Sequence, residues 1–191
     1  MSFGNPLFPI FLKLDQIQTL IVGGGAVGLE KLEGLLKNDP KANITLVAPE
    51  VLDEIAEKQR FHPGFKIERR RFRTQDLKGT DLLILATDDR QLHERIRRRA
   101  RRRHMLVNVA DTPDLCDFYL GSTVKKGDLK IGISTNGKSP TFAKRVRQML
   151  EEMLPDETDE LLQNLRSIRD KLKGNFGEKV KKLNEITKEL V

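Results

Sequence analysis

The stretch Thr19–Lys31, TLIVGGGAVGLEK, decides the fold of this 191-residue chain. A short apolar run, Leu20–Val22, leads directly into Gly23–Gly28, which reads G-x-G-x-x-G, and apolar residues at helical spacing follow at once. The stretch therefore predicts a strand, a glycine turn and a helix, the arrangement that brings a pyrophosphate against the backbone and the helix N-terminus. We expect a dinucleotide site here. The alternative is a nucleotide-free turn of the same shape, which would need fewer glycines.

The composition is that of a globular chain, with 38% hydrophobic and 33% charged residues. No apolar run approaches the ~20 residues of a membrane span, and the first 15 residues lack the basic region and cleavage site of a signal peptide. Cys116 is the only cysteine, which excludes an internal disulfide and fits a reducing cytosol. No metal-ligand spacing is present. We therefore predict a cytoplasmic protein with no membrane partner and no metal site.

The formal net charge of +7 is concentrated in one segment, residues 90–103, RQLHERIRRRARRR, which holds eight Arg and one Glu. Leu92, Ile96 and Ala100 lie four apart within it and form a single apolar stripe on a helix. Three interpretations of the arginines stay open: a solvated outer face, a basic rim that attracts a polyanionic small molecule, and a nucleic-acid surface. Because no helix-turn-helix or winged segment adjoins this helix, we predict no nucleic-acid partner.

The first 113 residues alternate between strand and helix patterns. Strands are expected at 5–14, 19–22, 43–47, 66–72, 81–86 and 105–109, and helices at 26–37, 51–60 and 90–103. The first of these strands is a short lead-in whose Phe8 and Phe11 would cover a sheet edge. The apolar run at 81–86 is typical of a central parallel strand. The fold class predicted is α/β, with a Rossmann-like doubly wound parallel sheet.

The pattern changes after residue 113. Strands at 118–124 and 129–134 flank a hairpin signal, and a polar loop at 134–140 follows. Ser139 is an expected N-cap with Pro140 at the first helical position, for a helix that ends before Pro155. Two amphipathic helices at 157–173 and 177–190 complete the chain. Alone they would bury little apolar surface, so they need the main body or a second subunit.

Carboxylates are the candidate bases of the chain. Asp111 lies just past the strand at 105–109, on the ligand side of such a sheet, where it could accept a proton while a hydride leaves the substrate. The alternative for Asp111 is an ordinary aspartate that starts a turn, and Asp88 and Asp89 carry the same ambiguity. Cys116 is most simply a small buried hydrophobe. In the second strand's exit loop the nearest acid is Glu50, with no Arg beside it to take a 2′-phosphate, which favours NAD over NADP.

Seven segments match one family in its order and spacing: NPLFPIFLKL, LIVGGGAVGLEK, LVAPE, LLILATDD, VNVADTPDLCDF, GDLKIGISTNGKSP and AKRVRQMLE. Together they resemble the siroheme-synthase N-terminal family, whose members are precorrin-2 dehydrogenases with or without sirohydrochlorin ferrochelatase activity. The resemblance covers nearly the whole chain. It implies NAD-dependent oxidation of precorrin-2 to sirohydrochlorin in siroheme biosynthesis, and it leaves the insertion of Fe²⁺ at the same site open.

The resemblance also implies a homodimer built from three parts. These are an NAD-binding Rossmann domain at 1–113, a dimerisation and substrate-cleft segment at 114–154, and a helical C-terminal domain at 155–191. A rival from another class is a non-enzymatic NAD(H)-sensing regulator, in which the arginine helix would contact a partner. In the rival the Rossmann domain would bind the cofactor and catalyse nothing.

The residue roles that the resemblance implies fall into three groups. Asp111 is the key catalytic residue. The cofactor contacts are Gly23, Gly24, Gly25, Ala26, Val27, Pro49, Glu50, Ala86, Thr87 and Asp88. The tetrapyrrole contacts are Asn108, Ser134, Asn136, Gly137, Lys138 and Ser139. Two departures from the family pattern occur, since Asn136 stands where glycine is frequent and His93 replaces a common asparagine.

Overall fold

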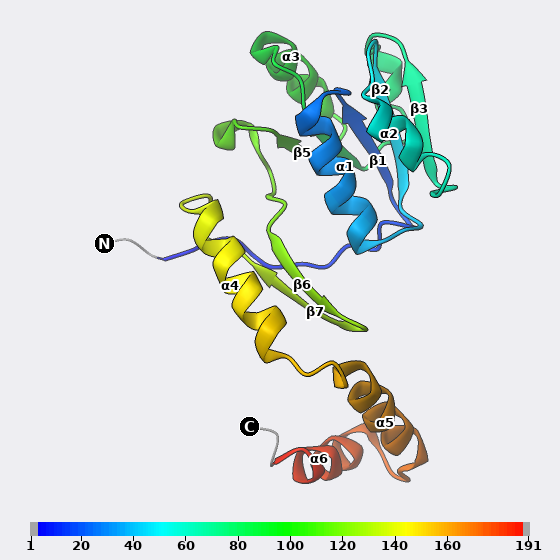
Figure 1. Cartoon of the computed structure of the whole chain (residues 1–191), viewed down its shortest axis with the longest axis vertical. Coiled ribbons are helices and arrows are strands. Elements are labelled where there is room, and N and C mark those ends of the chain that lie inside the picture. Colours follow the sequence, from blue (N-terminus) through cyan, green and yellow to red (C-terminus); the bar gives the residue numbers. More distant parts are fainter. Residues whose placement is uncertain (1–3, 189–191) are drawn as a thin grey trace. The chain divides into compact units, whose positions relative to one another are not determined.

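Two compact units make up the protein, one spanning Pro6–Leu120 and the other containing the chain from Gly121 onward. The computed structural model describes residues 4–188 (Figure 1). Among them no helix is long and apolar enough to cross a membrane. The boundaries predicted at residues 113 and 154 remain a prediction.

A five-stranded sheet forms the centre of the first unit. Its strands are β1 (Gln18–Val22), β2 (Asn43–Ala48), β3 (Phe65–Arg69), β4 (Leu82–Leu85) and β5 (Leu106–Val109). They are parallel throughout and lie in the order β3-β2-β1-β4-β5. From β1 the strands β2 and β3 are added on one side of the sheet, and β4 and β5 are added on the other. A crevice at the carboxyl ends of the strands is expected where the strand order switches in this way, between β1 and β4. The predicted doubly wound parallel sheet is confirmed.

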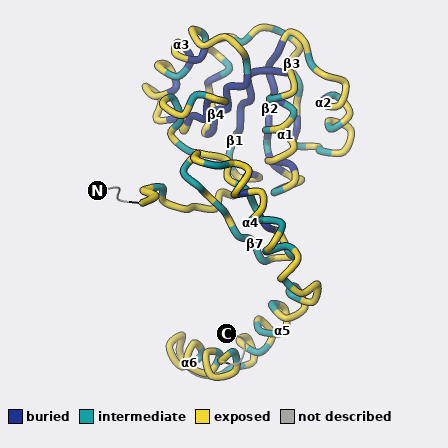
Figure 2. Tube along the Cα trace, turned by 60° about the vertical axis from the view of Figure 1, so that its left-hand side comes forward, coloured by how far each residue is buried: buried dark blue, intermediate teal, exposed yellow. Residues whose placement is uncertain are grey.

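Helices cover both faces of this sheet. They are α1 (Ala26–Asn38), α2 (Asp53–Lys58) and α3 (Arg90–Arg101), with short 3-10 turns at Thr74–Leu77 and Pro113–Leu115. Ile21 of β1 packs with α1 and α2, whereas Leu20 and Val22 pack with α3. Because successive side chains point to opposite faces, both sets are buried, and the strands read as continuous apolar runs (Figure 2).

The lead-in segment differs from its prediction. No strand forms between residues 4 and 14, and Phe8 and Phe11 are 86% and 69% exposed, so they cover no edge in this chain. Pro6 and Pro9 lack the N–H groups that a ladder requires, which explains why the segment does not pair. The predicted strand at 66–72 also ends early, at Arg69, as the edge strand β3.

The second unit holds a hairpin and three helices. These elements are β6 (Ser122–Lys126), β7 (Leu129–Ile133), α4 (Pro140–Met153), α5 (Thr158–Lys171) and α6 (Phe176–Ile186). The hairpin is antiparallel, as predicted, and Ser139 caps α4 by accepting a hydrogen bond from the N–H of Phe142 at 3.1 Å. The strand predicted at 118–124 begins only at Ser122. The predicted end of the last helix, at 190, lies outside the described residues.

Candidate functional site

The glycine turn between β1 and α1 has no room for side chains at three positions, Gly23, Gly24 and Gly28. Gly23 has a φ of +125°, and a Cβ atom there would overlap the carbonyl oxygen of Ala86. A Cβ atom at Gly28 would overlap the carbonyl oxygen of Gly23. Gly23 and Gly28 therefore let α1 and the loop after β4 close against the turn.

Gly25 differs from these glycines because open space surrounds its Cα. It is the N-cap of α1, where no side chain bonds the helix N-terminus and the first turn contains no acidic residue. The first N–H groups of a helix need acceptors, and the helix dipole favours an anion beside them. An open, uncapped helix end against a glycine turn fits the pyrophosphate of a dinucleotide. Ala26, also exposed, continues this surface.

The adenosine end expected at Pro49 and Glu50 adjoins the glycine turn. The N–H of Leu52 donates to the carbonyl oxygen of Gly24 at 3.0 Å, and a Cβ atom at Gly24 would overlap the carbonyl oxygen of Glu50. The exposed residues Pro49 and Glu50 therefore lie beside the turn.

A cation near this adenosine end was not predicted from the sequence. The register of β2 and β3 sets Arg69 opposite Ala48, immediately before Pro49 and Glu50. Arg69 is exposed. It is distant in sequence from Glu50, and only the pairing of the two strands brings it to the same edge.

A pocket of about 220 Å³ opens at the carboxyl ends of β4 and β5. It is lined by Val27, Ala86, Thr87, Asp88, Arg90, His93, Ala110, Asp111 and Thr112. Five of these residues, from three separate stretches of sequence, were predicted to act on cofactor or substrate. The other four, Arg90, His93, Ala110 and Thr112, were not among the predicted site residues.

Asp111 stands in an unusual backbone conformation on the rim of this pocket. Its φ is +54°, a left-handed value that aspartate tolerates better than most residues. The turn is held by the N–H of Ala110, which donates to the carbonyl oxygen of Leu85 at 2.9 Å, and by the N–H of Thr112, which donates to Val109. Asp111 is exposed, and among residues 4–188 its carboxylate has no hydrogen-bond or ion-pair partner. Its carboxylate is therefore accessible from the pocket.

Thr87 contacts a histidine that also lines the pocket. The Nε2 atom of His93 lies 2.8 Å from the hydroxyl oxygen of Thr87, and His93 is only 3% exposed. Burial lowers the pKa of His93, against the opposing effect of the nearby carboxylates of Asp89 and Asp88. The neutral imidazole is therefore the form that the folded pocket favours.

This buried histidine predicts a pH-dependent stability. Because the pKa of His93 is lower in the folded protein, the unfolded chain binds more protons, and the free energy of unfolding falls as the pH drops below about 6.5. In a His93→Asn protein, melting temperatures between about pH 7.5 and pH 5.5 should change less than in the wild type. His104→Asn, at an exposed position, is the control. Equal slopes for the wild type and His93→Asn would contradict the prediction.

Asn108, predicted to contact substrate, has its side chain engaged elsewhere. It is 6% exposed, and its Nδ2 atom donates to the carbonyl oxygen of Phe118 at 2.9 Å. Contact with substrate therefore remains a prediction, and the contact that is present holds the chain after β5.

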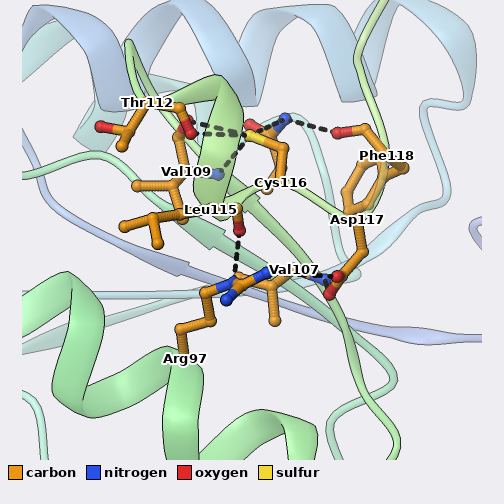
Figure 3. Close-up of polar contacts among 9 residues, drawn as sticks. Arg97, Val107, Val109, Thr112, Leu115, Cys116, Asp117 and Phe118 are labelled. Carbon is orange, nitrogen blue, oxygen red and sulfur yellow. Dashed lines mark hydrogen bonds and ion pairs between the residues drawn. The ribbon is translucent and has the colours of Figure 1, made fainter.

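Cys116 is half-buried and more polar in its contacts than the sequence indicated. Its Sγ atom accepts from the N–H of Val109 and lies 3.2 Å from that residue's carbonyl oxygen (Figure 3). Burial raises the pKa of the Cys116 thiol, which keeps it protonated and unreactive.

The remaining predicted tetrapyrrole contacts lie in the loop between β7 and α4, in the second unit. Asn136 has a φ of +54° and Gly137 a φ of +73°. The hydroxyl of Ser134 accepts from the N–H of Asn136 at 3.1 Å, and Lys138 is exposed. Asparagine adopts left-handed backbone more readily than other non-glycine residues, which explains how it stands where the family often has glycine.

No group of three metal-ligating side chains occurs within the described part of the chain. The polar groups that line the pocket include the carboxylate of Asp111 and the hydroxyl of Thr87, which lies within hydrogen-bond distance of His93.

Comparison with known proteins gives two family matches in sequence. Residues 10–122 match the family described as "Putative NAD(P)-binding", and residues 126–153 match that described as "Sirohaem biosynthesis protein central". The siroheme synthase of Methylococcus capsulatus is 35% identical over 168 residues, which cover 86% of this chain and 34% of the relative. That of Pseudoalteromonas translucida is 36% identical, covering 88% of this chain and 35% of the relative. The chain thus spans about a third of the length of the curated relatives it matches.

A solved structure agrees with these matches. SirC, a precorrin-2 dehydrogenase, superposes with a TM-score of 0.72 at 26% identity, over 94% of this chain and 89% of that one. The first family match, at residues 10–122, contains the parallel sheet and the glycine turn, and the second, at 126–153, follows it directly. The chain therefore belongs to the NAD(P)-binding, siroheme-synthase N-terminal family.

Proposed function

We propose that the protein oxidises precorrin-2 to sirohydrochlorin with NAD as hydride acceptor, in siroheme biosynthesis. The observation that supports this most is the pocket beside the glycine turn. It brings the unpaired carboxylate of Asp111 together with Val27 of α1 and with Ala86–Asp88 after β4. SirC, whose name is that of a precorrin-2 dehydrogenase, resembles this chain in structure over 94% of this chain's length.

The residues of the pocket divide the work of this reaction. Bound NAD would supply the acceptor for a hydride from a carbon of the macrocycle. The turn at Gly25 and the start of α1 would hold the pyrophosphate, and Val27 and Thr87 line the pocket beside that turn. Asp111 accepts the proton that the macrocycle loses and passes it to solvent, to which its carboxylate is open. One hydride and one proton account for the two hydrogens removed.

The choice between the two nicotinamide dinucleotides is tested with both. Glu50 beside the glycine turn supports NAD, because a carboxylate suits a ribose hydroxyl and repels a 2′-phosphate. Arg69, across from Ala48, is the cation in position to weaken that preference. We expect NAD to give the higher kcat/KM, and Arg69→Gln to widen its advantage.

The deciding experiment is an anaerobic absorbance assay with purified protein, enzymatically generated precorrin-2 and NAD. Sirohydrochlorin and NADH should form in equal amounts. Fe²⁺ added afterwards tests insertion of the metal in the same cuvette. Binding of NAD without any turnover would reject the dehydrogenase and favour the NAD(H)-sensing regulator.

A homodimer is the second part of the proposal, and α4 supports it. Phe142, Met149 and Met153 are 62%, 51% and 69% exposed and recur at intervals of seven and four residues, so they form one apolar stripe along the helix. Exposed apolar stripes of this kind are typical of protein interfaces. We place the dimer contact in the segment 114–154, with the helical domain at 155–191 after it. The cytoplasmic location stays a prediction.

This stripe predicts that one charge disrupts the dimer. In a two-fold interface each substitution counts twice, and losing a buried side chain costs about 1.5–3 kcal/mol per copy. Met149→Glu should therefore weaken dimerisation at least about a hundredfold. Light scattering after size exclusion measures it, with Lys144→Glu, at an exposed position on the side of α4 away from the stripe, as the control. A Met149→Glu protein that stays dimeric would move the interface elsewhere.

A further inference from the structure

Arg97 differs from the neighbouring arginines of α3 because its side chain is largely buried. The side chain of Arg97 is 19% exposed, whereas Arg95, Arg98 and Arg99 are exposed residues of the same helix, α3. Arg97 lies one turn after His93, which reaches Thr87 in the pocket. The inner face of α3 thus holds two polar side chains. His93 contacts the loop after β4, and Arg97 contacts the loop after β5.

Arg97 contacts the chain that follows Asp111. Its Nε atom donates to the carbonyl oxygen of Leu115 at 2.7 Å, and its Nη2 atom lies 3.7 Å from Oδ1 of Asp117 (Figure 3). A guanidinium is suited to two such acceptors at once, because its donors lie in one rigid plane.

Asp117 connects this contact to the sheet. Its Oδ2 atom accepts from the N–H of Val107 at 3.2 Å, and its own N–H donates to the carbonyl oxygen of Val107 at 2.7 Å (Figure 3). Val107 belongs to β5, which is an edge strand. The thiol of Cys116 likewise accepts a hydrogen bond from the N–H of Val109. Two side chains therefore bond backbone N–H groups of β5 that a further strand would otherwise pair with.

The turn with Asp111 is therefore closed at both ends. It leaves β5 at Val109 and returns to β5 at Asp117, and the thiol of Cys116 lies within hydrogen-bond distance of the carbonyl oxygen of Thr112, at 3.4 Å. The left-handed conformation of Asp111 is costly by itself, and such conformations persist where their surroundings hold them. Among residues 4–188, Arg97 is the residue of a separate helix whose side chain bonds this closed turn.

We propose that Arg97 is a positioning residue that fixes the catalytic turn through Leu115 and Asp117. This rests on the proposed function only for its effect on turnover. A displacement of about 1 Å of a reacting group can cost about a hundredfold in rate. Arg97→Gln should lower kcat at least about tenfold while the KM for NAD changes less than about twofold, because the glycine turn is elsewhere.

The experiment compares Arg97→Gln with Arg98→Gln, which removes the same charge from the exposed face of α3. Turnover is measured together with hydrogen exchange. The peptide spanning residues 107–117 should exchange faster in Arg97→Gln, with the peptide over α1 unchanged. Arg97→Lys should recover part of the lost kcat, since it keeps the charge that faces Asp117.

The results that would contradict the role of Arg97 differ from those that would contradict the proposed function. Unaltered exchange of residues 107–117 in Arg97→Gln, or an equal loss of kcat in Arg98→Gln, would overturn the positioning role. If the wild type has no dehydrogenase activity, the proposed function fails, and the exchange measurement alone decides the role of Arg97. Should Arg97→Gln not fold, Asp117→Asn breaks the same ion pair and keeps the bond to Val107 available.

Discussion

An Asp111→Asn protein is expected to bind NAD as the wild type does and to oxidise precorrin-2 about a hundredfold more slowly, or slower still. Loss of a general base costs about 10²–10⁴-fold, and asparagine cannot accept the proton. Asparagine is chosen because the φ of +54° at this position is one that it tolerates, so the turn is kept while the carboxylate is removed. Asp111→Ala would remove the carboxylate and strain the turn at once.

The measurement is steady-state turnover together with the dissociation constant for NAD. Asp114→Asn is the matched control, because Asp114 is an exposed carboxylate of the same loop and does not line the pocket. A fall in kcat without a change in the NAD dissociation constant is the expected signature. Wild-type turnover in Asp111→Asn would remove its assignment as the base, and a parallel loss in Asp114→Asn would show that the effect comes from loop charge.

The sheet was predictable because its signals are local. An apolar run before G-x-G-x-x-G and a helical pattern after it give strand, turn and helix, and a parallel sheet brings the ends of its strands to one edge. That rule alone predicts that Val27, Thr87 and Asp111 approach one another, and they line a single pocket.

The contacts behind the pocket were not predictable in the same way. Leu92, Ile96 and Ala100 identified the buried face of α3, but His93 and Arg97 share that face and were counted with the polar residues. A buried polar side chain follows the helical spacing of the core and is recognised only by its partner, which comes from another part of the chain.

Strand boundaries failed for a related reason. The apolar residues at 118–121 look like the start of a strand, yet β6 begins at Ser122. The backbone at Asp117 and Phe118 is already bonded to β5 and to Asn108. Side-chain hydrogen bonds over a separation of ten residues decide where this chain leaves the sheet, and no periodicity records them.

Alanine substitutions at two glycines of the glycine turn are expected to have different effects, one on NAD binding and the other on stability. Gly25→Ala should fold normally, because its φ of −87° suits any residue and no atom lies within 4 Å of the new Cβ. It should bind NAD at least about tenfold more weakly, since the methyl group occupies the open space that a pyrophosphate needs and a lost charge-assisted contact is worth about 1.5–3 kcal/mol.

Gly23→Ala should instead fail as a folded protein. Its φ of +125° and the overlap with the carbonyl oxygen of Ala86 should lower the free energy of unfolding by about 3 kcal/mol or more. Gly34→Ala, within α1 and away from any neighbour, is the control that should gain up to about 1 kcal/mol and leave NAD binding unchanged. Denaturation and NAD titration of the three proteins separate the two roles. Normal NAD affinity in Gly25→Ala would mean that the pyrophosphate does not approach this helix end, and the cofactor would have to bind elsewhere on the sheet.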